Sequence, residues 1–206
     1  MGNPFILEKI SIDPPREKIY QRLGYKKSTT EISAQQRTQT DRLIHEASDL
    51  ISLNGMFLRL DIHLNDGEKI LLANHLNFTS KKLAAFLGDC REAVLMGATA
   101  GQAIMDAIKD KTGRNDLSAA VVYDAAASEM VDGALDWMMG YINRILRREG
   151  KILLPRRFSA GYADFLLENQ KTIYDSLHMK NFGVKISRTF ILIPEKSVTA
   201  IGGIRG

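Results

Sequence analysis

The sequence predicts an α+β fold, namely a single domain with a largely antiparallel twisted sheet flanked by helices. Residues 57–72 alternate apolar and polar side chains around an Asn-Asp-Gly turn, which is typical of a β-hairpin. Residues 117–148 place apolar side chains at helical spacing. Strands and helices follow one another without the regular βαβ order of a parallel sheet. No repeat or linker divides the 206 residues, so one domain over residues 1–206 is the simplest organisation.

The elements before the buried part of the sheet follow from local signals. Residues 4–25 are expected to be irregular, because two consecutive prolines disfavour a helix there. Residues 35–53 carry apolar side chains at helical spacing, so a helix is expected to precede the hairpin. After the hairpin, Thr79 or Ser80 can cap a short helix.

Apolar runs and their periodicity predict the remaining elements. They are a buried strand over 93–96, a Gly-rich turn over 97–101, a helix that ends near 113, helices over 117–148 and 168–177, and closing strands over 185–193 and 197–204.

Composition places the chain among ordinary globular proteins. Hydrophobic residues make up 45% of it and charged residues 25%, and its single cysteine, Cys90, excludes an intrachain disulfide. No apolar run reaches the length of a membrane span, and the first residues lack a signal-peptide pattern. We therefore expect a cytoplasmic protein without a membrane partner. The net charge of +4 is not accompanied by basic runs interleaved with aromatic residues, so no nucleic-acid partner is expected.

A cluster of cations follows the long helix. Such a cluster suits the negative end of the helix dipole, and the alternative is a docking patch for an acidic partner. Its members are Arg144, Arg147, Arg148, Lys151, Arg156 and Arg157.

The long helix carries a stripe of small residues and a line of polar ones. Ala119, Ala126, Gly133 and Gly140 recur every seven residues. Each interior glycine costs about 1 kcal/mol relative to alanine, so the stripe predicts close packing against another backbone or a ligand. Asp124, Ser128 and Asp132 lie four residues apart, so they share one face of the helix as a binding line or a solvated edge.

The segment from Arg157 to Tyr162 reads R-x-x-x-G-Y. An arginine fork can hold a carboxylate through two parallel hydrogen bonds, and a glycine lets the backbone approach a ligand closely. A tyrosine offers a ring face to a cation and a hydroxyl to a polar group. The segment therefore suits a zwitterionic ligand, and the simpler alternative is a surface ion pair beside a half-buried ring.

This motif is followed by the helical run 167–177, by Phe182-Gly183-Val184 and by the segment 194–198. In this order they resemble the activation (S-adenosylmethionine-binding) domain of cobalamin-dependent methionine synthase. The resemblance implies that Arg157 binds the methionine carboxylate of S-adenosylmethionine and that Ala160, Gly161 and Tyr162 line the same site. It also implies that Asp132 lies near the amino group or the sulfonium charge of the ligand.

This sequence differs from the family's pattern at the end of the chain. The family's longer domain continues past its final strand with aromatic residues that help to bind the nucleoside, whereas this sequence stops at 202–206. We therefore expect a short, stand-alone version of the domain.

The function implied by the resemblance is that of an accessory subunit in methionine biosynthesis. On a partner methionine synthase chain, one electron from a flavodoxin-like donor would reduce cobalamin from its inactive cobalt(II) state. This chain would then present the methyl group of S-adenosylmethionine to the reduced cobalamin. Such reductive methylation depends on positioning, so no catalytic residue is predicted in this chain. The alternatives are a sensor that binds S-adenosylmethionine without methyl transfer, and a corrinoid-protein partner of another methyltransferase.

Other motifs give weaker signals. The segment 61–67 approaches the D-x-H-x-x-G pattern of cobalamin-binding domains, but its glycine comes one residue late and the segment alternates as a strand. Any cobalamin is therefore expected on a partner chain only. The four histidines and Cys90 show no metal-type spacing, so no metal ligand is predicted. No Gly-rich loop follows a first strand, which disfavours the usual doubly wound methyltransferase fold.

Overall fold

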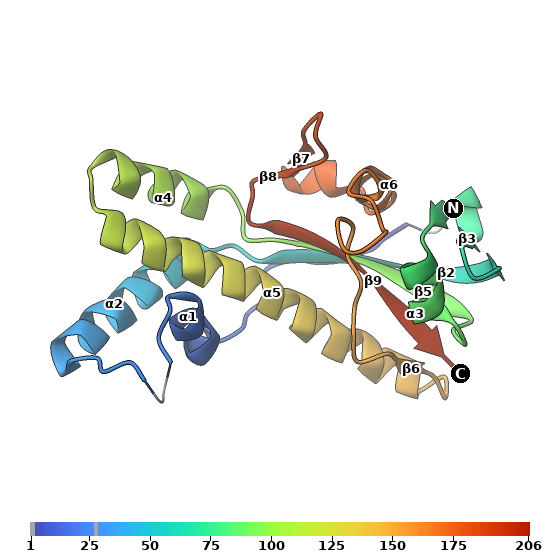
Figure 1. Cartoon of the computed structure of the whole chain (residues 1–206), viewed down its shortest axis with the longest axis horizontal. Coiled ribbons are helices and arrows are strands. Elements are labelled where there is room, and N and C mark those ends of the chain that lie inside the picture. Colours follow the sequence, from blue (N-terminus) through green and yellow to red (C-terminus); the bar gives the residue numbers. More distant parts are fainter. Residues whose placement is uncertain (1–2, 27–28) are drawn as a thin grey trace.

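A twisted antiparallel sheet forms the centre of the computed structural model, which describes residues 3–26 and 29–206 (Figure 1). Its strands run in the order β4-β3-β2-β5-β9-β6, and β1 pairs with the part of β2 that β3 leaves open. The strands of this sheet are β1 (Phe5–Leu7), β2 (Asn54–Asn65), β3 (Lys69–Leu72), β4 (Asn77–Thr79), β5 (Glu92–Thr99), β6 (Ile152–Leu153) and β9 (Ser197–Arg205).

Helices cover both faces of this sheet, which confirms the predicted α+β class. The α-helices are α1 (Arg16–Arg22), α2 (Ala34–Leu50), α3 (Lys81–Leu87), α4 (Ala103–Gly113), α5 (Leu117–Arg147) and α6 (Asn169–Ser176). Two short 3₁₀ helices, η1 (Ala73–His75) and η2 (Met179–Phe182), and a separate hairpin of β7 (Lys185–Ile186) and β8 (Leu192–Ile193) complete the fold.

The central strand β5 is buried on both faces. It pairs with β2 on one side and with β9 on the other, and all 8 of its residues are buried. Val94, Met96 and Ala98 belong to the core that includes α2, α4 and α5. Ala93 and Leu95 point to the opposite core, which includes α3 and α6. A strand covered on both faces has no polar side, which explains its continuous apolar sequence.

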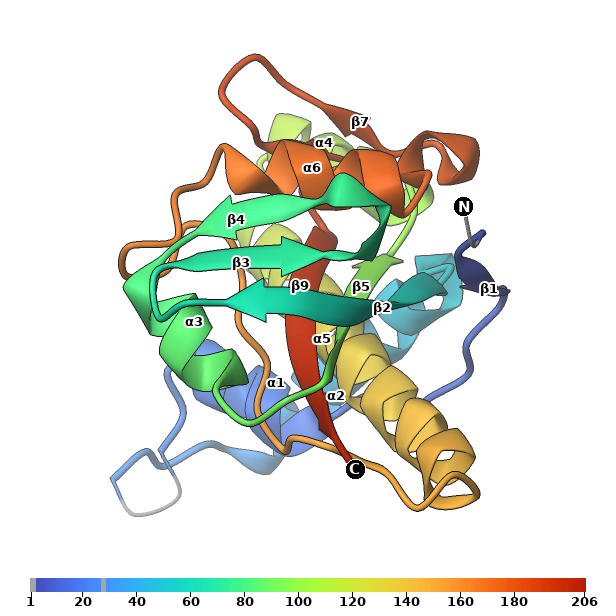
Figure 2. The ribbon, with the colours of Figure 1, turned by 90° about the vertical axis from the view of Figure 1, so that its right-hand side faces the viewer.

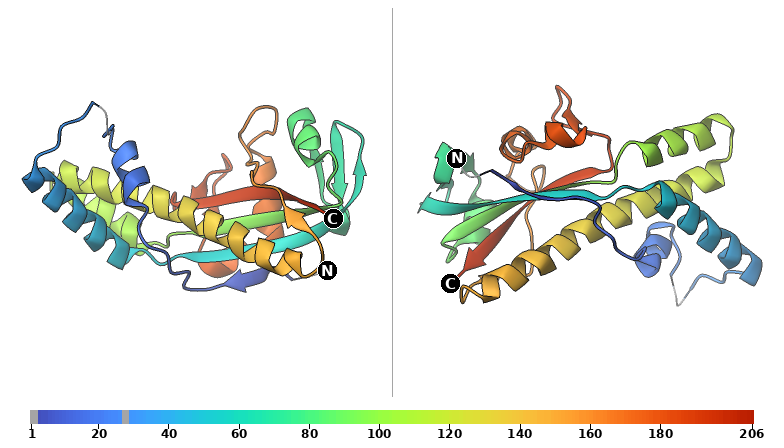
Figure 3. Two further views of the ribbon diagram at one scale, coloured as in Figure 1. Left: turned by 90° about the horizontal axis from the view of Figure 1, so that it is seen from below. Right: turned by 180° about the vertical axis from the view of Figure 1, so that it is seen from behind.

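The 31-residue helix α5 connects two parts of the molecule. Figure 1 shows its first half between α2 and α4, beyond the ends of the strands, and Figure 3 shows its second half lying across the sheet. In Figure 2, β2, β3 and β4 stand in front of this helix, with α3 and α6 at their sides. The second half of α5 therefore lies close to the end of β9 and to the segment that follows β6.

The small-residue stripe of α5 changes its environment along the helix. Ala119 and Ala126 are buried, and a Cβ on Gly133 would lie 2.8 Å from Cδ1 of Ile12. A Cβ on Gly140 would meet nothing within 4 Å. A straight α-helix rotates a seven-residue repeat by about 20° per heptad, so the stripe turns outward towards its end. Gly133 is thus closely packed, although against the side chain of Ile12 and not against a backbone. At Gly140 no other part of the protein packs closely, and packing against a ligand there stays a prediction.

Several predicted elements are confirmed with small shifts of their ends. The helix over 35–53 is α2, which Ser33 and Gln36 begin with a capping box. The hairpin is formed by β2 and β3 around the predicted turn, where Asp66 accepts hydrogen bonds from two backbone N–H groups. Ser80 is the N-cap of α3, because its hydroxyl accepts from the N–H of Leu83.

The prediction of an irregular segment over 4–25 is wrong. This segment contains β1, which pairs with β2, and the helix α1. The second proline, Pro15, is the N-cap residue of α1, where a helix requires no backbone N–H from it. The proline pair therefore marks the start of a helix instead of excluding one.

Two predictions near the ends of strands also need correction. The strand over 185–193 is divided into β7 and β8, because Ser187 turns the chain and accepts a hydrogen bond from the N–H of Ile191. The Gly-rich turn over 97–101 is partly strand, since β5 continues to Thr99. A Cβ on Gly97 would lie 3.1 Å from Leu177 and 3.2 Å from Met179, so its role is close packing.

No helix in the described part of the chain is long and apolar enough to cross a membrane.

Candidate ligand site beside the long helix

The segment with the R-x-x-x-G-Y motif is fixed along the edge of the sheet. Leu154 donates a backbone hydrogen bond to Gly203 on β9, at 2.8 Å. Phe158 and Ile201 exchange two backbone hydrogen bonds of 2.8 and 2.7 Å. The side chain of Phe158 packs against Phe86 and Phe165 on the α3 and α6 side. Because neighbouring side chains of an extended chain point to opposite faces, Arg157 is directed to the other side, towards α5.

Arg157 meets two carboxylates of α5. Its Nη1 donates a short hydrogen bond to Oδ1 of Asp136, and its Nη2 lies 3.5 Å from Oδ1 of Asp132. The same Nη1 lies 3.7 Å from the sulfur of Met139. The Arg157 side chain is 24% exposed, so the ion pairs are partly shielded from water. The structure thus brings together Arg157 and Asp132, two predicted site residues separated in sequence.

Asp136 is a residue of the candidate site that the sequence analysis missed. It lies one turn beyond Asp132, at the i+4 spacing that places two side chains on one helix face. Extension of the Asp124, Ser128 and Asp132 line by one further turn could have identified it.

A cation from α1 also reaches this cluster. Nζ of Lys18 lies 3.2 Å from Oδ2 of Asp136, so α1 flanks the site. Burial opposes ionisation of the Asp136 carboxyl, but hydrogen bonds and charges from Arg157 and Lys18 outweigh it. The pKa of Asp136 is therefore held below its ordinary value, and the carboxylate is charged at neutral pH.

The glycine of the motif forms a tight turn. Gly161 has a φ of +90°, a conformation that favours glycine, and its N–H donates to the carbonyl of Phe165 at 2.7 Å. Ala160 is buried, whereas the side chain of Tyr162 is 68% exposed. Within residues 3–26 and 29–206, no hydrogen bond or ring contact joins Tyr162 to Arg157. Ala160 and Gly161 therefore shape the turn, and Tyr162 stands at its surface.

The turn is anchored to α3 by a residue that the motif does not include. Oδ1 of Asp164 accepts a hydrogen bond from the Ser80 hydroxyl at 2.6 Å, and Oδ2 accepts one from the N–H of Lys81 at 2.8 Å. The Ser80 hydrogen bond holds the pKa of Asp164 below its ordinary value, and the N–H groups at the start of α3 add to this effect. Asp164 therefore fixes the R-x-x-x-G-Y turn relative to the sheet.

A shallow groove begins at Asp136 and follows α5 towards its end. Its volume is about 290 Å³. The α5 side is formed by Asp136, Met139, Gly140 and Asn143, and the opposite side by Leu153, Leu154 and Pro155. The missing side chain of Gly140 leaves this groove open. A partly apolar groove beside an Arg–Asp cluster can receive a molecule with one charged end and one planar or apolar end.

The rest of the polar line of α5 binds a lysine. Nζ of Lys196 lies 2.6 Å from Oδ1 of Asp124 and 2.9 Å from the hydroxyl of Ser128. The Lys196 side chain is 13% exposed and the Asp124 side chain 51%, so the cation of this pair is more buried than Arg157 but its carboxylate is not. The predicted polar line is thus divided between a contact with Lys196 and a cluster around Arg157.

The cations of the predicted basic cluster have different roles. Arg157 belongs to the site, and Lys151 forms ion pairs with Glu92 and Glu149. Arg147, Arg148 and Arg156 are exposed. Arg144 lies over the ring of Tyr141, at 5.8 Å from its centroid. A docking role for the exposed members stays a prediction.

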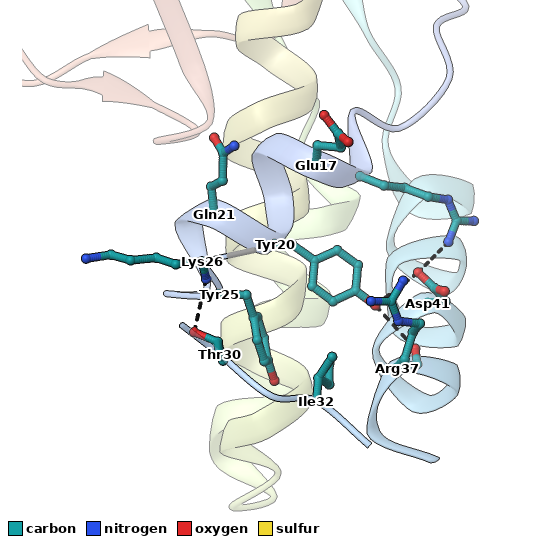
Figure 4. A pocket seen from close by; sticks show the side chains of 10 residues that line it. Glu17, Tyr20, Gln21, Tyr25, Lys26, Thr30, Ile32, Arg37 and Asp41 are labelled. Atoms are coloured by element: carbon teal, nitrogen blue, oxygen red, sulfur yellow. Dashed lines mark hydrogen bonds and ion pairs between the residues drawn. The ribbon is translucent and has the colours of Figure 1, made fainter. Parts of the chain in front are cut away.

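A larger cavity of about 700 Å³ lies between α1 and α2, away from the motif (Figure 4). Its charged groups largely satisfy each other. Arg16 forms an ion pair of 2.6 Å with Asp41, and the Tyr20 hydroxyl donates to the same carboxylate at 3.2 Å. None of its lining residues belongs to the predicted site. The chemistry of the motif therefore identifies the Arg157 cluster, and not this cavity, as the candidate site.

The comparisons with known proteins identify the fold. No protein-family model matches the chain, and no curated protein matches its sequence. Among solved structures, the MetH reactivation domain bound to AdoHcy is similar, with a TM-score of 0.68 and 14% sequence identity. The match covers 98% of this chain and 78% of that chain. At this identity the similarity shows the fold, so the chain has the fold of the MetH reactivation domain. The resemblance indicated by the sequence motifs is confirmed at that level.

Proposed function

We propose that this chain binds S-adenosylmethionine at the Arg157 cluster and serves as a reactivation subunit for a cobalamin-dependent methionine synthase. The observation that carries this proposal is the position of Arg157, whose guanidinium lies within ion-pair distance of Asp132 beside an open groove. The structural neighbour with AdoHcy bound adds support, because AdoHcy differs from S-adenosylmethionine by the transferred methyl group.

The two charges of the cluster fit the amino-acid end of this ligand. The Arg157 fork offers parallel N–H donors to the methionine carboxylate, and Asp132 offers a carboxylate to the ammonium or the sulfonium. Ala160, Gly161 and Tyr162 would line the same site, with the Tyr162 ring available for stacking. The site would therefore hold S-adenosylmethionine in one orientation, with its amino-acid end at α5.

The contribution of this chain to methyl transfer would be positioning. A cobalamin on a partner chain would supply the acceptor of the methyl group, with one electron from a flavodoxin-like donor. Within this chain no general base is required, because the methyl group leaves a sulfonium without loss of a proton. Correct orientation of two reactants can by itself remove several kcal/mol of a barrier, on the order of 7–11 in favourable cases.

Calorimetry tests the binding step. Wild-type protein should bind S-adenosylmethionine, and Arg157→Ala should weaken binding by about 1.5–3 kcal/mol, the range for hydrogen bonds to charged groups. Arg148→Ala is a matched control, because Arg148 is an exposed arginine at the end of α5. Absence of any heat signal with wild-type protein at millimolar ligand would contradict direct binding.

A second experiment separates methyl transfer from sensing. A cobalamin-loaded methionine synthase chain, an electron donor and S-adenosylmethionine are mixed with this protein, and the absorption spectrum is followed. Regeneration of methylcobalamin that depends on Arg157 supports the proposed role. An unchanged cobalt(II) spectrum with ligand bound would instead identify a binding sensor.

A further inference from the structure

We propose that Asp136 is a built-in competitor for the carboxylate of the ligand. It holds the guanidinium of Arg157 in the ligand-free chain and releases it when the ligand binds. This inference rests on the proposed function, because it names the groups that are exchanged at the same site.

The geometry of Arg157 shows which groups already compete for its N–H donors. A carboxylate binds an arginine fork best when both of its oxygens accept hydrogen bonds from it. In this structure the two terminal nitrogens are divided, with Nη1 on Asp136 and Nη2 3.5 Å from Asp132. A third carboxylate that binds both terminal nitrogens therefore competes with these two aspartates for the N–H donors of the fork.

Asp136 is the aspartate that can withdraw at lower cost. Its second oxygen, Oδ2, lies 3.2 Å from Nζ of Lys18, so the charge stays compensated after Arg157 leaves. Its side chain is 48% exposed, which allows water to replace the lost hydrogen bond. Within the described part of the chain, the only ion pair of Asp132 is the one with Arg157. Asp132 is therefore the residue available for the ammonium group of the ligand.

Lys18, which lies in α1 and 118 residues from Asp136 in sequence, is the second cation that binds the Asp136 carboxylate. Its attraction favours the state in which Asp136 has left Arg157. In the Arg157–Asp136 pair the carboxylate is 48% exposed and the guanidinium 24%, so water screens part of the attraction. A bidentate contact with the ligand carboxylate replaces this single contact favourably. The apparent affinity for the ligand equals the affinity of molecules with a free Arg157 multiplied by the fraction of molecules in that state. Molecules in which Asp136 occupies Arg157 lower this fraction.

Substitution of the competitor tests the inference. Asp136→Asn should bind S-adenosylmethionine about two- to fivefold more tightly than wild type, as expected for loss of a partly exposed competing ion pair. Asp124→Asn, which removes a carboxylate of the same helix that binds Lys196, should leave the affinity unchanged. Because damage to the fold lowers affinity, a gain cannot arise from misfolding.

Lys18 provides an independent test. Lys18→Met should weaken binding about two- to fivefold in the wild-type background and have no effect in the Asp136→Asn background. Equal weakening in both backgrounds would assign Lys18 to the ligand itself and overturn its role as the partner of Asp136.

A spectroscopic measurement follows the exchange directly. The Asp136 carboxyl is titrated by carbon NMR with and without S-adenosylmethionine, and its pKa should rise when the ligand takes Arg157 away. The charged groups that face this carboxyl are Arg157, Lys18 and Asp132.

The outcomes distinguish the two proposals. Wild-type binding with no gain in Asp136→Asn and no change in the Asp136 pKa would overturn the competitor role while leaving the proposed function intact. Absence of binding by wild type and by every variant would overturn both.

Discussion

Arg157 is positioned by neighbours on both sides of the sheet edge. Phe158, the next residue, is fixed to Ile201 by two backbone hydrogen bonds, and this fixes the direction of the Arg157 side chain. Behind the motif, Phe165 is fully buried and lies edge-on to Phe78, with ring centroids 5.4 Å apart. A buried aromatic residue thus supports the turn, while the exposed Tyr162 of the same turn is free to meet a ligand.

This division of roles predicts that one aromatic residue of the turn contributes to stability and the other to ligand binding. Phe165→Ala should lower the free energy of unfolding by about 3–5 kcal/mol, because it removes a fully buried ring. Tyr162→Ala should change it by less than about 0.5 kcal/mol and should weaken ligand binding instead. Urea denaturation and calorimetry provide the two measurements. A large loss of stability in Tyr162→Ala would contradict its assignment to the ligand.

The predictability of the site also depends on individual residues. Arg157 and Gly161 could be selected from a local motif, and Asp132 from helix spacing together with the family resemblance. The contact of Lys18 with Asp136 could not, because it joins residues 118 positions apart and depends on how α1 packs against α5. Asp164 was missed for a similar reason, since its role as a cap depends on the distant start of α3.

At the scale of elements, α5 connects the helical part of the molecule to the sheet and carries the acidic side of the site. Its length and helical character could be predicted from sequence periodicity, as could β2, β3 and α3. The strands and the α-helix that were missed, β1, β4, β6, α1 and the β7–β8 hairpin, are short, with 2 to 7 residues each. Short elements carry too few periodic positions to be recognised, and contacts with distant segments stabilise them.

The outward rotation of the α5 stripe predicts different effects at two glycines. Gly140→Ala should raise the free energy of unfolding by about 0.5–1 kcal/mol, because it improves helix propensity and fills open space. Gly133→Ala should gain less, because Cδ1 of Ile12 must move from its place 2.8 Å from the new Cβ. Thermal or urea denaturation without ligand measures both. Equal gains at the two positions would contradict the packing described for Gly133.

At the scale of the whole molecule, a network of four charges joins the sheet to the end of α5. Arg59 on β2 bonds Glu92 on β5 and Glu149 after α5, both at 2.7 Å. Lys151 lies 2.5 Å from Glu92 and 3.3 Å from Glu149. The hydrogen bond from Arg59 lowers the pKa of Glu149 to about 2, with Lys151 adding to the effect. Burial disfavours the charge of Glu92, but Lys151 and Arg59 outweigh it and its pKa is also lowered.

These lowered pKa values predict an acid-sensitive contribution to stability. A carboxyl with a lower pKa in the folded state stabilises the fold above its unfolded pKa and loses this effect as pH falls through the folded pKa. For Glu149 the window runs from its ordinary value of 4.5 down to about 2. Glu149→Gln should therefore be less stable than wild type at pH 7, and the difference should shrink as the pH falls through that window.

Urea denaturation of both proteins at a series of pH values measures this difference. Glu8→Gln, a substitution at an exposed carboxyl on the opposite end of the sequence, serves as the control. A difference between wild type and Glu149→Gln that stays constant between neutral and acid pH would contradict the role given to the network.

The central claim is that Arg157 holds the amino-acid end of S-adenosylmethionine against α5, and a crystal structure of the chain soaked with this ligand tests it most directly. The account predicts the ligand carboxylate on both terminal nitrogens of Arg157, its ammonium group near Asp132, and Asp136 turned towards Lys18. Ligand density at another place, or an Arg157 side chain that makes no contact with the ligand carboxylate, would contradict it.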